Sequence, residues 1–319
     1  MSKKILVIAS GGDAPGMNAC VESIWTHAQK FGWQVFGGAG YTALIEGLWV
    51  PIDAALASGI SHMTACVVGS SRSKAFGTPE GIAAAVANAK ASFDAIVVLG
   101  GNGSLKGAWE KLERNGVNVI GIPATIDNDV FFTKNSLGFS SAVEEGARLV
   151  DNLNGTMRAN ERDHVIQIMG WHCDELTKAI GEATFADIID VNENRHSPQQ
   201  IAQILERNRT AGKGSSTVLI QEKVDKSKDR NFIREMHEGV DFWNQIAAFA
   251  GDDIRGHILG HTLRGAAPSA RDRWLGFHYG RVAVELIQVG KFGVGIGLVG
   301  DDFTTETLEE IKRRNFDAT

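Results

Sequence analysis

The chain is poor in cysteine and proline, and it has no long hydrophobic run. Its 319 residues include 3 cysteines, Cys20, Cys66 and Cys173. This odd number of widely separated thiols argues against a disulfide framework and favours a reducing compartment. The first apolar run, residues 5–9, is too short for a signal peptide or a membrane span. We therefore expect a cytoplasmic protein.

An excess of positive charge is also lacking. The chain has 32 Lys and Arg against 38 Asp and Glu, which gives a formal net charge of -6. Such a chain has no general attraction for nucleic acid or for an anionic membrane surface. We expect neither as a partner, so any phosphate site must be built locally.

Glycine is abundant where proline is scarce. The 37 glycines against 6 prolines indicate many tight turns without the proline content of disordered segments. Apolar runs alternate with amphipathic stretches, which predicts an α/β fold of parallel sheets covered by helices, in two lobes. The predicted strands cover residues 5–9, 95–99, 117–122, 165–169, 217–220 and 293–299. The predicted helices cover residues 17–30, 105–115, 141–153, 198–209, 232–248, 270–289 and 306–314.

Two of the predicted helices have a capping signature. Ser197 precedes Pro198, which is the pattern of an N-cap with proline at the first helical position. Thr304 and Thr305 stand before the last predicted helix in the same way. The charge-dense passage 222–238 is predicted to be a solvated loop that leads onto a helix.

Two glycine-rich loops each follow a predicted strand and open a predicted helix. Residues 10–18 read S-G-G-D-A-P-G-M-N, and residues 100–104 read G-G-N-G-S. Glycines let backbone N–H groups face an anion, and the helix dipole adds to this attraction. A tight structural turn explains one such loop equally well, but two in one chain favour polyphosphate binding. The G-x-G-x-x-G at residues 295–300 lies inside an apolar run, and we interpret it as coincidence.

A third loop carries carboxylates at the end of a predicted strand. Asp127 and Asp129 are two residues apart, and in an extended segment both would point to one side. One carboxylate can accept the proton of an attacking hydroxyl while another holds Mg²⁺ through water, as phosphoryl transfer requires. An Asx-rich turn is the alternative interpretation of D-N-D.

These motifs together resemble the bacterial, ATP-dependent 6-phosphofructokinase family, in order and over essentially the whole chain. The family strings are G-G-D-A-P-G-M-N at residues 11–18, T-I-D-N-D at 125–129, M-G at 169–170 and L-G-H-x-x-R-G at 259–265. The resemblance implies two lobes, each a mainly parallel sheet sandwiched by helices. It assigns residues 1–137 and 263–319 to a nucleotide-binding lobe and residues 138–262 to a sugar-phosphate-binding lobe.

The resemblance implies an activity and a set of site residues. The activity is phosphorylation of fructose 6-phosphate at its 1-hydroxyl by ATP and Mg²⁺, in a homotetramer where some phosphate-binding arginines come from a neighbouring subunit. The implied catalytic residues are Asp127 as the base, Thr125 and Arg72. The implied ATP-binding residues are Gly11, Arg72, Ser73, Gly101, Asn102, Gly103 and Ser104, and the implied metal residues are Asn102 and Asp129. The implied substrate-binding residues are Thr125, Ile126, Asp127, Arg162, Met169, Gly170, Trp171, Glu222, Arg255, His261 and Arg264. Arginine suits a sugar phosphate because its planar guanidinium stays charged.

The chain departs from the family pattern at groups that carry charge. Asn102 replaces the aspartate expected to hold Mg²⁺, so metal affinity should fall. Trp171 replaces an arginine expected near the transferring phosphoryl group, a loss of about 2.7 to 4 kcal/mol by analogy with an oxyanion-hole donor. Lys74 and Lys106, close to the glycine loops in sequence, are candidates to compensate. The departures leave two alternatives open: a weakened paralogue that acts as a binding or regulatory protein, and a kinase for another phosphosugar.

Donor choice and regulation are predicted from four further positions. Gly103 and Ala124 are small where pyrophosphate-using relatives carry larger charged residues, which favours ATP. Val21 and Trp25 stand where allosteric members carry arginines for an anionic effector. We therefore predict no response to ADP or phosphoenolpyruvate.

Overall fold

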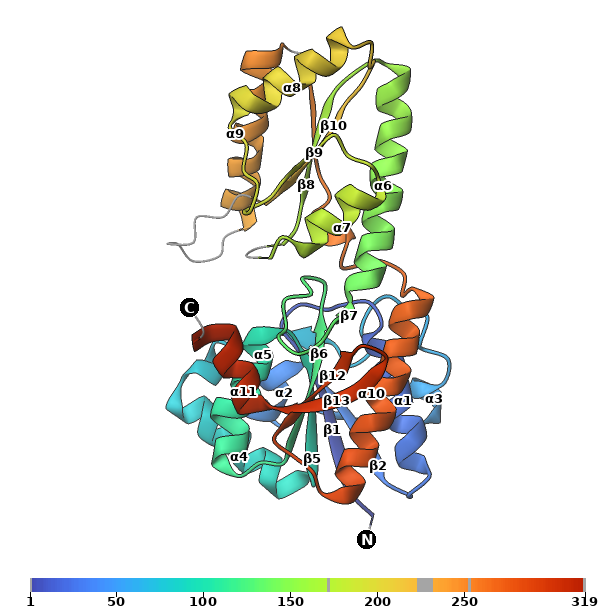
Figure 1. Ribbon diagram of the computed structural model, residues 1–319. Helices are drawn as coiled ribbons and strands as arrows, with labels where there is room; N and C mark the ends of the chain where they lie inside the picture. The colour runs from blue at the N-terminus through green and yellow to red at the C-terminus, as the bar shows by residue number, and fades with distance from the viewer. Residues whose placement is uncertain (1, 171–172, 223–231, 252–253, 318–319) are drawn as a thin grey trace. The chain divides into compact units, whose positions relative to one another are not determined.

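The computed structural model describes residues 2–170, 173–222, 232–251 and 254–317. The chain divides into two compact units, one made of Met1–Ser141 with Arg264–Thr319 and the other of Ala142–Leu263. Each unit has a mainly parallel sheet with helices on both faces (Figure 1), so the predicted α/β fold with two lobes is confirmed. None of the described helices combines the length and the apolar character needed to cross a membrane.

The sheet of the first unit is parallel in its centre and antiparallel at its edges. The edge strand β3 runs antiparallel to β2, and the edge strand β13 runs antiparallel to β12. The five strands between these edges are all parallel to one another. The short strands β4 (Ser70–Ser71) and β7 (Leu137–Gly138) pair with β1 and β6. The order is β13 (Asp302–Thr307), β12 (Val294–Val299), β6 (Val119–Thr125), β5 (Ala95–Gly100), β1 (Lys4–Ser10), β2 (Gln34–Gly38) and β3 (Val50–Ile52).

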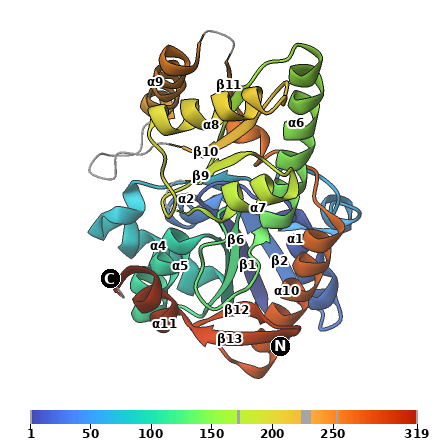
Figure 2. The ribbon, with the colours of Figure 1, turned by 45° about the horizontal axis from the view of Figure 1, so that its top comes forward.

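Two groups of helices cover this sheet, as Figures 1 and 2 show. One face carries α1 (Met17–Gln29) and α10 (Ala270–Val289), and Gly276 and Gly280 let them approach closely. A Cβ at these glycines would lie 2.8 Å from the backbone nitrogen of Cys20 and 2.6 Å from the Cβ of Ser23. The other face carries α2 (Gly40–Glu46), α4 (Pro79–Ser92), α5 (Asn102–Gly107) and α11 (Leu308–Lys312), and the short α3 (Ala54–Ala57) contacts α1.

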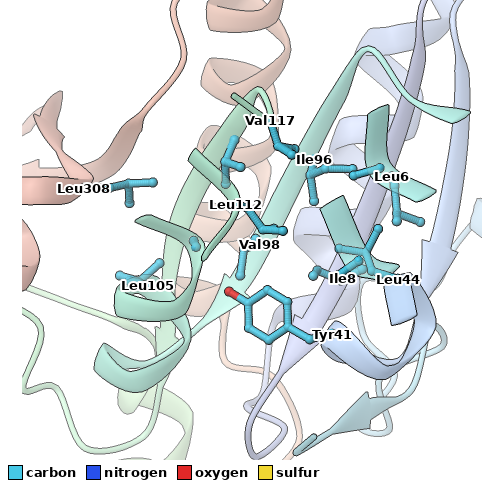
Figure 3. Packing of buried hydrophobic residues seen from close by; sticks show 14 of the residues in the cluster. Leu6, Ile8, Tyr41, Leu44, Ile96, Val98, Leu105, Leu112, Val117 and Leu308 are labelled. Carbon is cyan, nitrogen blue, oxygen red and sulfur yellow. The ribbon is translucent and has the colours of Figure 1, made fainter. Parts of the chain in front are cut away.

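One hydrophobic core cluster of the first unit lies between the sheet and the helices α2, α4 and α5 (Figure 3). Alternate residues of β1 and β5 point into it, including Leu6, Ile8, Ile96 and Val98. Helix residues such as Leu105 close it from the other side. Both strands are buried along almost their whole length, which is why they read as unbroken apolar runs in the sequence.

The second unit has a parallel sheet in the order β11 (Arg255–Ile258), β8 (His164–Ile168), β10 (Thr217–Gln221) and β9 (Ile188–Asp190). Figure 1 shows α8 (Pro198–Thr210) and α9 (Phe232–Ala250) on one face, with α6 (Phe139–Ala159) and α7 (Glu175–Ala183) on the other. Gly256 on β11 lets the Trp243 ring of α9 lie against the strand, because a Cβ there would come within 2.3 Å of the ring.

The predicted elements are largely confirmed, with two differences. Ser197 caps α8 in a full capping box with Gln200, as its sequence predicts. The predicted cap at Thr304 and Thr305 is wrong: both residues lie in β13, and Thr307 caps the last helix by accepting from the Glu310 backbone nitrogen at 3.2 Å. The predicted helix 105–115 is α5 followed by a π-helical turn and a 3-10 turn. Of the charged passage, residues 223–231 lie outside the described residues.

Candidate active site

Three loops of the first unit leave the same edge of the sheet side by side. β1, β5 and β6 are adjacent and parallel, and their register places Ser10 beside Gly100 and Gly100 beside Pro123. The segments that follow are the two glycine-rich loops and T-I-D-N-D. Ligands of open parallel sheets bind at this carboxyl edge.

Hydrogen bonds of the Ser104 side chain connect the second glycine loop to the first. Its hydroxyl donates to the backbone oxygen of Ser10 at 2.9 Å and lies 3.0 Å from the Ser10 hydroxyl. Gly100 has to be glycine, because a Cβ would lie 2.6 Å from the Ser10 backbone oxygen. Gly11 has a φ of 100°, and its nitrogen donates to the Ser71 backbone oxygen at 3.0 Å. Ser71 ends β4, so the predicted ATP residues Arg72 and Ser73 follow directly beside the first loop.

A pair of stacked aromatic residues packs against the second glycine loop and the short helix that follows it. Tyr41 and Phe76 are buried and stacked, with ring centroids 3.9 Å apart. The Tyr41 hydroxyl donates to the backbone oxygen of Ser104 at 2.6 Å, and burial raises the pKa of this phenol well above its usual value. A Cβ at Gly107 would lie 3.2 Å from the Phe76 ring. Tyr41 cannot be recognised from the sequence, because a lone aromatic residue on a short helix belongs to no motif.

Arg264 belongs to the first unit and lies on the first glycine loop. Its guanidinium packs over Gly12, where a Cβ would come within 2.8 Å of Nη1, and Nη1 donates to the Asp13 backbone oxygen at 3.2 Å. The side chain is almost completely buried. The other predicted substrate arginines, Arg162 and Arg255, belong to the second unit.

The T-I-D-N-D loop turns sharply instead of staying extended. The Thr125 hydroxyl accepts from the Asp127 backbone nitrogen at 3.2 Å and lies 3.4 Å from the Asp127 carboxylate. Asn128 has a φ of 55°, and its side chain accepts from the Ser136 nitrogen at 2.8 Å. The extended geometry expected for Asp127 and Asp129 is therefore wrong, because Asn128 reverses the backbone between them. Thr125 and Ile126 are buried, and the Asp127 side chain is partly exposed.

Asn102 connects the second glycine loop to the third loop. Its amide nitrogen donates to the backbone oxygen of Asp129 at 3.0 Å, and its Oδ1 is buried with no partner among the described residues. Desolvation, followed by the negative charge of Asp127, raises the pKa of Asp129 to about 6. Gly103 is exposed, with no atom within 4 Å of a Cβ placed there.

The G-x-G-x-x-G sequence has a packing role next to this loop. Gly295 and Gly297 lie on β12, and a Cβ at Gly297 would come within 2.4 Å of the Phe132 ring. Phe132 has a φ of 76°, which is unusual for an aromatic residue. The glycines therefore leave room for the ring that ends the third loop.

In the second unit, one group of predicted sugar-binding residues lies at the carboxyl ends of the strands. Met169 and Gly170 follow β8, and Glu222 follows β10. The Glu222 nitrogen donates to the Ile168 oxygen at 2.9 Å, and the buried Glu222 carboxylate accepts from the Gly170 nitrogen at 3.4 Å. His261 is exposed in the turn that follows β11.

A second group lies at the opposite end of the same sheet. Arg162 stands two residues before β8, and Arg255 opens β11, where it pairs with His164. The five residues of β8 separate these arginines from Met169, a strand length of about 16 Å at 3.3 Å per residue. Within one chain, the second unit does not bring Arg162 and Arg255 to Glu222. Trp171 lies outside the described residues.

Comparisons with known proteins identify the family of the chain. Residues 4–287 match the Phosphofructokinase family. The chain belongs to the phosphofructokinase family. It is 34% identical over 315 residues to ATP-dependent 6-phosphofructokinase 1 of Thermus thermophilus, covering 98% of this chain and 95% of that protein. It is 32% identical to an ATP-dependent 6-phosphofructokinase of Lactobacillus delbrueckii subsp. bulgaricus, covering 97% of this chain and 93% of that protein.

Solved structures share the fold. Phosphofructokinase from Saccharomyces cerevisiae superposes with a TM-score of 0.84 at 28% identity, covering 98% of this chain. The chain spans only 46% of the length of that yeast chain. A pyrophosphate-dependent phosphofructokinase from Marinobacter aquaeolei superposes with a TM-score of 0.82 at 20% identity, over 97% of this chain and 83% of the other. At that identity the likeness concerns the fold alone.

Proposed function

We propose that this member of the phosphofructokinase family transfers the γ-phosphoryl group of ATP to the 1-hydroxyl of fructose 6-phosphate. The observation that carries the proposal is the position of Asp127. A partly exposed carboxylate stands on a loop that leaves the sheet edge beside the second glycine loop, with the first glycine loop one strand further along. The curated relatives that match over nearly the whole chain are named ATP-dependent 6-phosphofructokinases.

Asp127 would act as the general base. It accepts the proton of the attacking hydroxyl, and Thr125 holds the turn that presents its carboxylate. The backbone N–H groups of the loops at Gly11 and at residues 101–104 would bind the phosphates, together with Arg72 and Ser73. The open space at Gly103 leaves room for the α-phosphate of a nucleotide, which supports ATP as the donor.

The residues present suit Mg²⁺, although they carry less charge than the family pattern. Mg²⁺ prefers oxygen ligands and keeps several waters. The unpartnered Oδ1 of Asn102 is such an oxygen, and the Asp129 carboxylate stands on the loop that Asn102 holds. When bound, the metal would neutralise charge on the transferring phosphoryl group. Asn102 and Asp129 would hold it, through water where the reach requires.

The second unit would bind the sugar through Glu222, Met169, Gly170 and His261, and Trp171 stays a proposed member of this set. Arg162 and Arg255 lie at the other end of the sheet in the same chain. If these arginines bind the 6-phosphate, they do so in the site of another copy. This separation supports an assembly in which copies share sites, such as the homotetramer that the resemblance implies. Arg264 would contact the sugar phosphate from the first glycine loop.

Location and regulation stay predictions. The few separated cysteines favour the cytoplasm. Val21 is completely buried in α1, and Trp25 is partly exposed. Neither side chain is charged, so neither can offer a cation to an anionic effector. We propose that ADP and phosphoenolpyruvate leave the rate unchanged.

A coupled assay tests the function. The protein is supplied with ATP and Mg²⁺ and a panel of phosphosugars, and pyrophosphate replaces ATP in a parallel series. We expect fructose 6-phosphate to be the best acceptor and ATP the better donor. Asp127→Asn should lower kcat by about 10² to 10⁴, the usual contribution of a general base, with a smaller change in KM. Asp301→Asn, an exposed aspartate in a turn, is the matched control.

Two results would contradict the proposal. Faster turnover of another phosphosugar would assign a different acceptor. Absence of turnover with every acceptor, together with tight phosphosugar or nucleotide binding by calorimetry, would favour a weakened paralogue that acts as a binding protein.

A further inference from the structure

We propose that Asn315 is a positioning residue for the loop that carries Asp127 and Asp129. This inference rests on the function proposed above, because it concerns the geometry of the same loop. Asn315 lies in the π-helical turn Arg313–Asp317 that follows α11, nearly 200 residues after the loop in sequence. Its Oδ1 accepts a hydrogen bond from the Phe131 backbone nitrogen at 3.0 Å.

The contact completes a set of anchors around Asp129. On one side, Asn102 donates to the Asp129 backbone oxygen at 3.0 Å. Two residues further along, Asn315 fixes the Phe131 nitrogen, and the Arg314 guanidinium lies 5.2 Å from the centroid of the Phe131 ring. The loop is thus held by side chains from two other segments of the first unit, one at the start of α5 and one after α11.

The loop needs outside anchors because its own backbone is unfavourable. Asn128 and Phe132 both have positive φ, 55° and 76°, and they bracket Asp129. Such conformations persist only where the surroundings hold them. The Phe131 side chain is 38% exposed, so its own burial contributes less to holding the loop than that of a core residue. The hydrogen bond from the Phe131 nitrogen to the Asn315 side chain adds a constraint at Phe131 itself, beside those that the Asn128 side chain and the packed Phe132 ring supply.

The segment that carries Asn315 is itself firmly attached. Glu310 on α11 accepts from Arg313 at 2.6 Å and from Arg314 at 2.8 Å. Leu308 is completely buried, and its side chain lies against Gly121 of β6. Lys106 of α5 lies with its Nζ 4.6 Å from the Phe316 ring centroid. Asn315 is therefore presented by a rigid support on both sides.

Loss of this contact should act on turnover more than on binding. Asp127 stands four residues before Phe131 and holds no bond to the segment 313–317 among the described residues. When the end of the loop is released, the Asp127 carboxylate occupies the productive position for a smaller fraction of time. A displacement of about 1 Å can cost about 10² in rate. The glycine loops that bind ATP are untouched, so KM for ATP should change little.

The test compares three variants with the full-length parent enzyme. Asn315→Ala removes the acceptor, and we expect kcat to fall at least tenfold with KM for ATP and fructose 6-phosphate within about twofold. Asn315→Asp keeps an acceptor oxygen at the same position. The Asn315 Nδ2 is buried without a partner among the described residues, so its replacement by oxygen removes no hydrogen bond but desolvates a negative charge. We therefore expect kcat to fall by less than in Asn315→Ala, by about threefold at most. Asn115→Ala, a change at an exposed asparagine that bonds only within its own turn, should behave as the parent.

Amide hydrogen exchange gives a second measurement that does not depend on activity. The Phe131 amide should exchange at least tenfold faster in Asn315→Ala than in the parent and should keep its protection in Asn315→Asp. If Asn315→Ala does not fold, Asn315→Leu removes the acceptor while keeping the side-chain volume. A kcat within twofold of the parent in the acceptor-free variant would overturn the proposal, as would equal losses in the Ala and Asp variants. If the parent enzyme does not phosphorylate fructose 6-phosphate, the proposed function fails, and unchanged Phe131 exchange in the acceptor-free variant would overturn the positioning role separately.

Discussion

The Asn102 amide nitrogen donates to the backbone oxygen of Asp129 across 3.0 Å. A carboxylate at position 102 has no proton to donate, so the aspartate of the family pattern cannot make this contact. The departure from the family is therefore more than a lost charge. It supplies a direct bond between the second glycine loop and the loop of Asp127, in a chain whose proposed metal ligands carry less charge than the family pattern.

Asn102→Asp should lower the stability of the protein without metal and raise its affinity for Mg²⁺. Without Mg²⁺, the variant loses one hydrogen bond and places a third carboxylate near Asp127 and Asp129, so the free energy of unfolding should fall by about 1 kcal/mol. With the proposed metal, the added charge should lower the Mg²⁺ concentration required for half-maximal rate several-fold. Urea denaturation without metal and a Mg²⁺ titration of the initial rate measure the two effects.

Asn102→Ala is the control for that variant. It should lose the hydrogen bond without gaining metal affinity, because it has no ligand oxygen. Equal Mg²⁺ requirements in Asn102→Asp and the parent would show that position 102 does not contact the metal or its waters.

The pKa of Asp129 predicts an acid limit on metal-dependent activity. Desolvation and the charge of Asp127 raise this pKa from 3.8 to about 6. Below about pH 6 the carboxyl is protonated and becomes a poor ligand, so at low Mg²⁺ the rate should fall and more Mg²⁺ should restore it. The folded protein holds this proton more tightly than the unfolded chain. The contribution of Asp129 to stability therefore decreases as the pH rises from about 4 to about 6 and is constant above.

Asp129→Asn tests both consequences. The variant should lose the part of the pH dependence of unfolding that lies between about pH 4 and 6, and its Mg²⁺ requirement should no longer change with pH in that window. Rate and urea-denaturation profiles from pH 4.5 to 8 provide the comparison. A parent profile that is flat between pH 5 and 7 at low Mg²⁺ would contradict the proposed role of Asp129.

Much of the fold follows from local sequence. The buried strands β1, β5 and β6 appear as apolar runs, and Ser197 marks the start of α8. Edge strands are harder to recognise: β13 alternates between partly buried and exposed residues and reads as a helix cap, because its residues are mostly polar. The alanine-rich helix α4 is not among the predicted helices, because its apolar residues form only a weak stripe.

The site is predictable only where a motif carries it. The loops at Gly11 and Asp127 follow from their strings and their place after strands. Tyr41, Phe132 and Asn315 do not, because each acts through a contact made far away in the sequence. No local pattern shows that Gly295 and Gly297 make room for the ring of Phe132, which belongs to another segment.

Gly297→Ala should destabilise the first unit and disturb the Asp127 loop. The new Cβ would lie 2.4 Å from the Phe132 ring and 2.9 Å from the Phe132 backbone oxygen, and the second of these cannot move without the loop. We expect a loss of about 1–3 kcal/mol in the free energy of unfolding and a lower kcat. Gly155→Ala on α6, where no atom lies within 4 Å, should instead raise stability by about 0.5–1 kcal/mol. Equal effects of the two changes in denaturation and assay would refute the packing role.

Asp272→Asn should show whether a completely buried carboxylate contributes net stability. Its two oxygens accept from the Gly138 nitrogen at 2.8 Å, the Ser141 nitrogen at 2.8 Å and the Ser141 hydroxyl at 2.5 Å, which joins α10 to the first turn of α6. Burial raises the pKa of Asp272, and these hydrogen bonds oppose that effect. In asparagine the amide protons would face at least one of these donors, so we expect the free energy of unfolding to fall by about 1–3 kcal/mol.

Variants at Asp272 and Ser141 distinguish the desolvation of the Asp272 charge from the hydrogen bonds that it accepts. If desolvation of the charge outweighs the three hydrogen bonds, Asp272→Asn should equal or exceed the parent in urea denaturation at pH 7. Ser141→Ala leaves the carboxylate but removes one of its donors, together with the acceptor of the Ser269 nitrogen at 2.9 Å. Its expected loss of about 1.5–3 kcal/mol is therefore an upper bound on the contribution of the hydrogen bond to Asp272. A stable Asp272→Asn beside an unstable Ser141→Ala would mean that this buried carboxylate is retained for the geometry of the α6 start, since the charge itself would then cost stability.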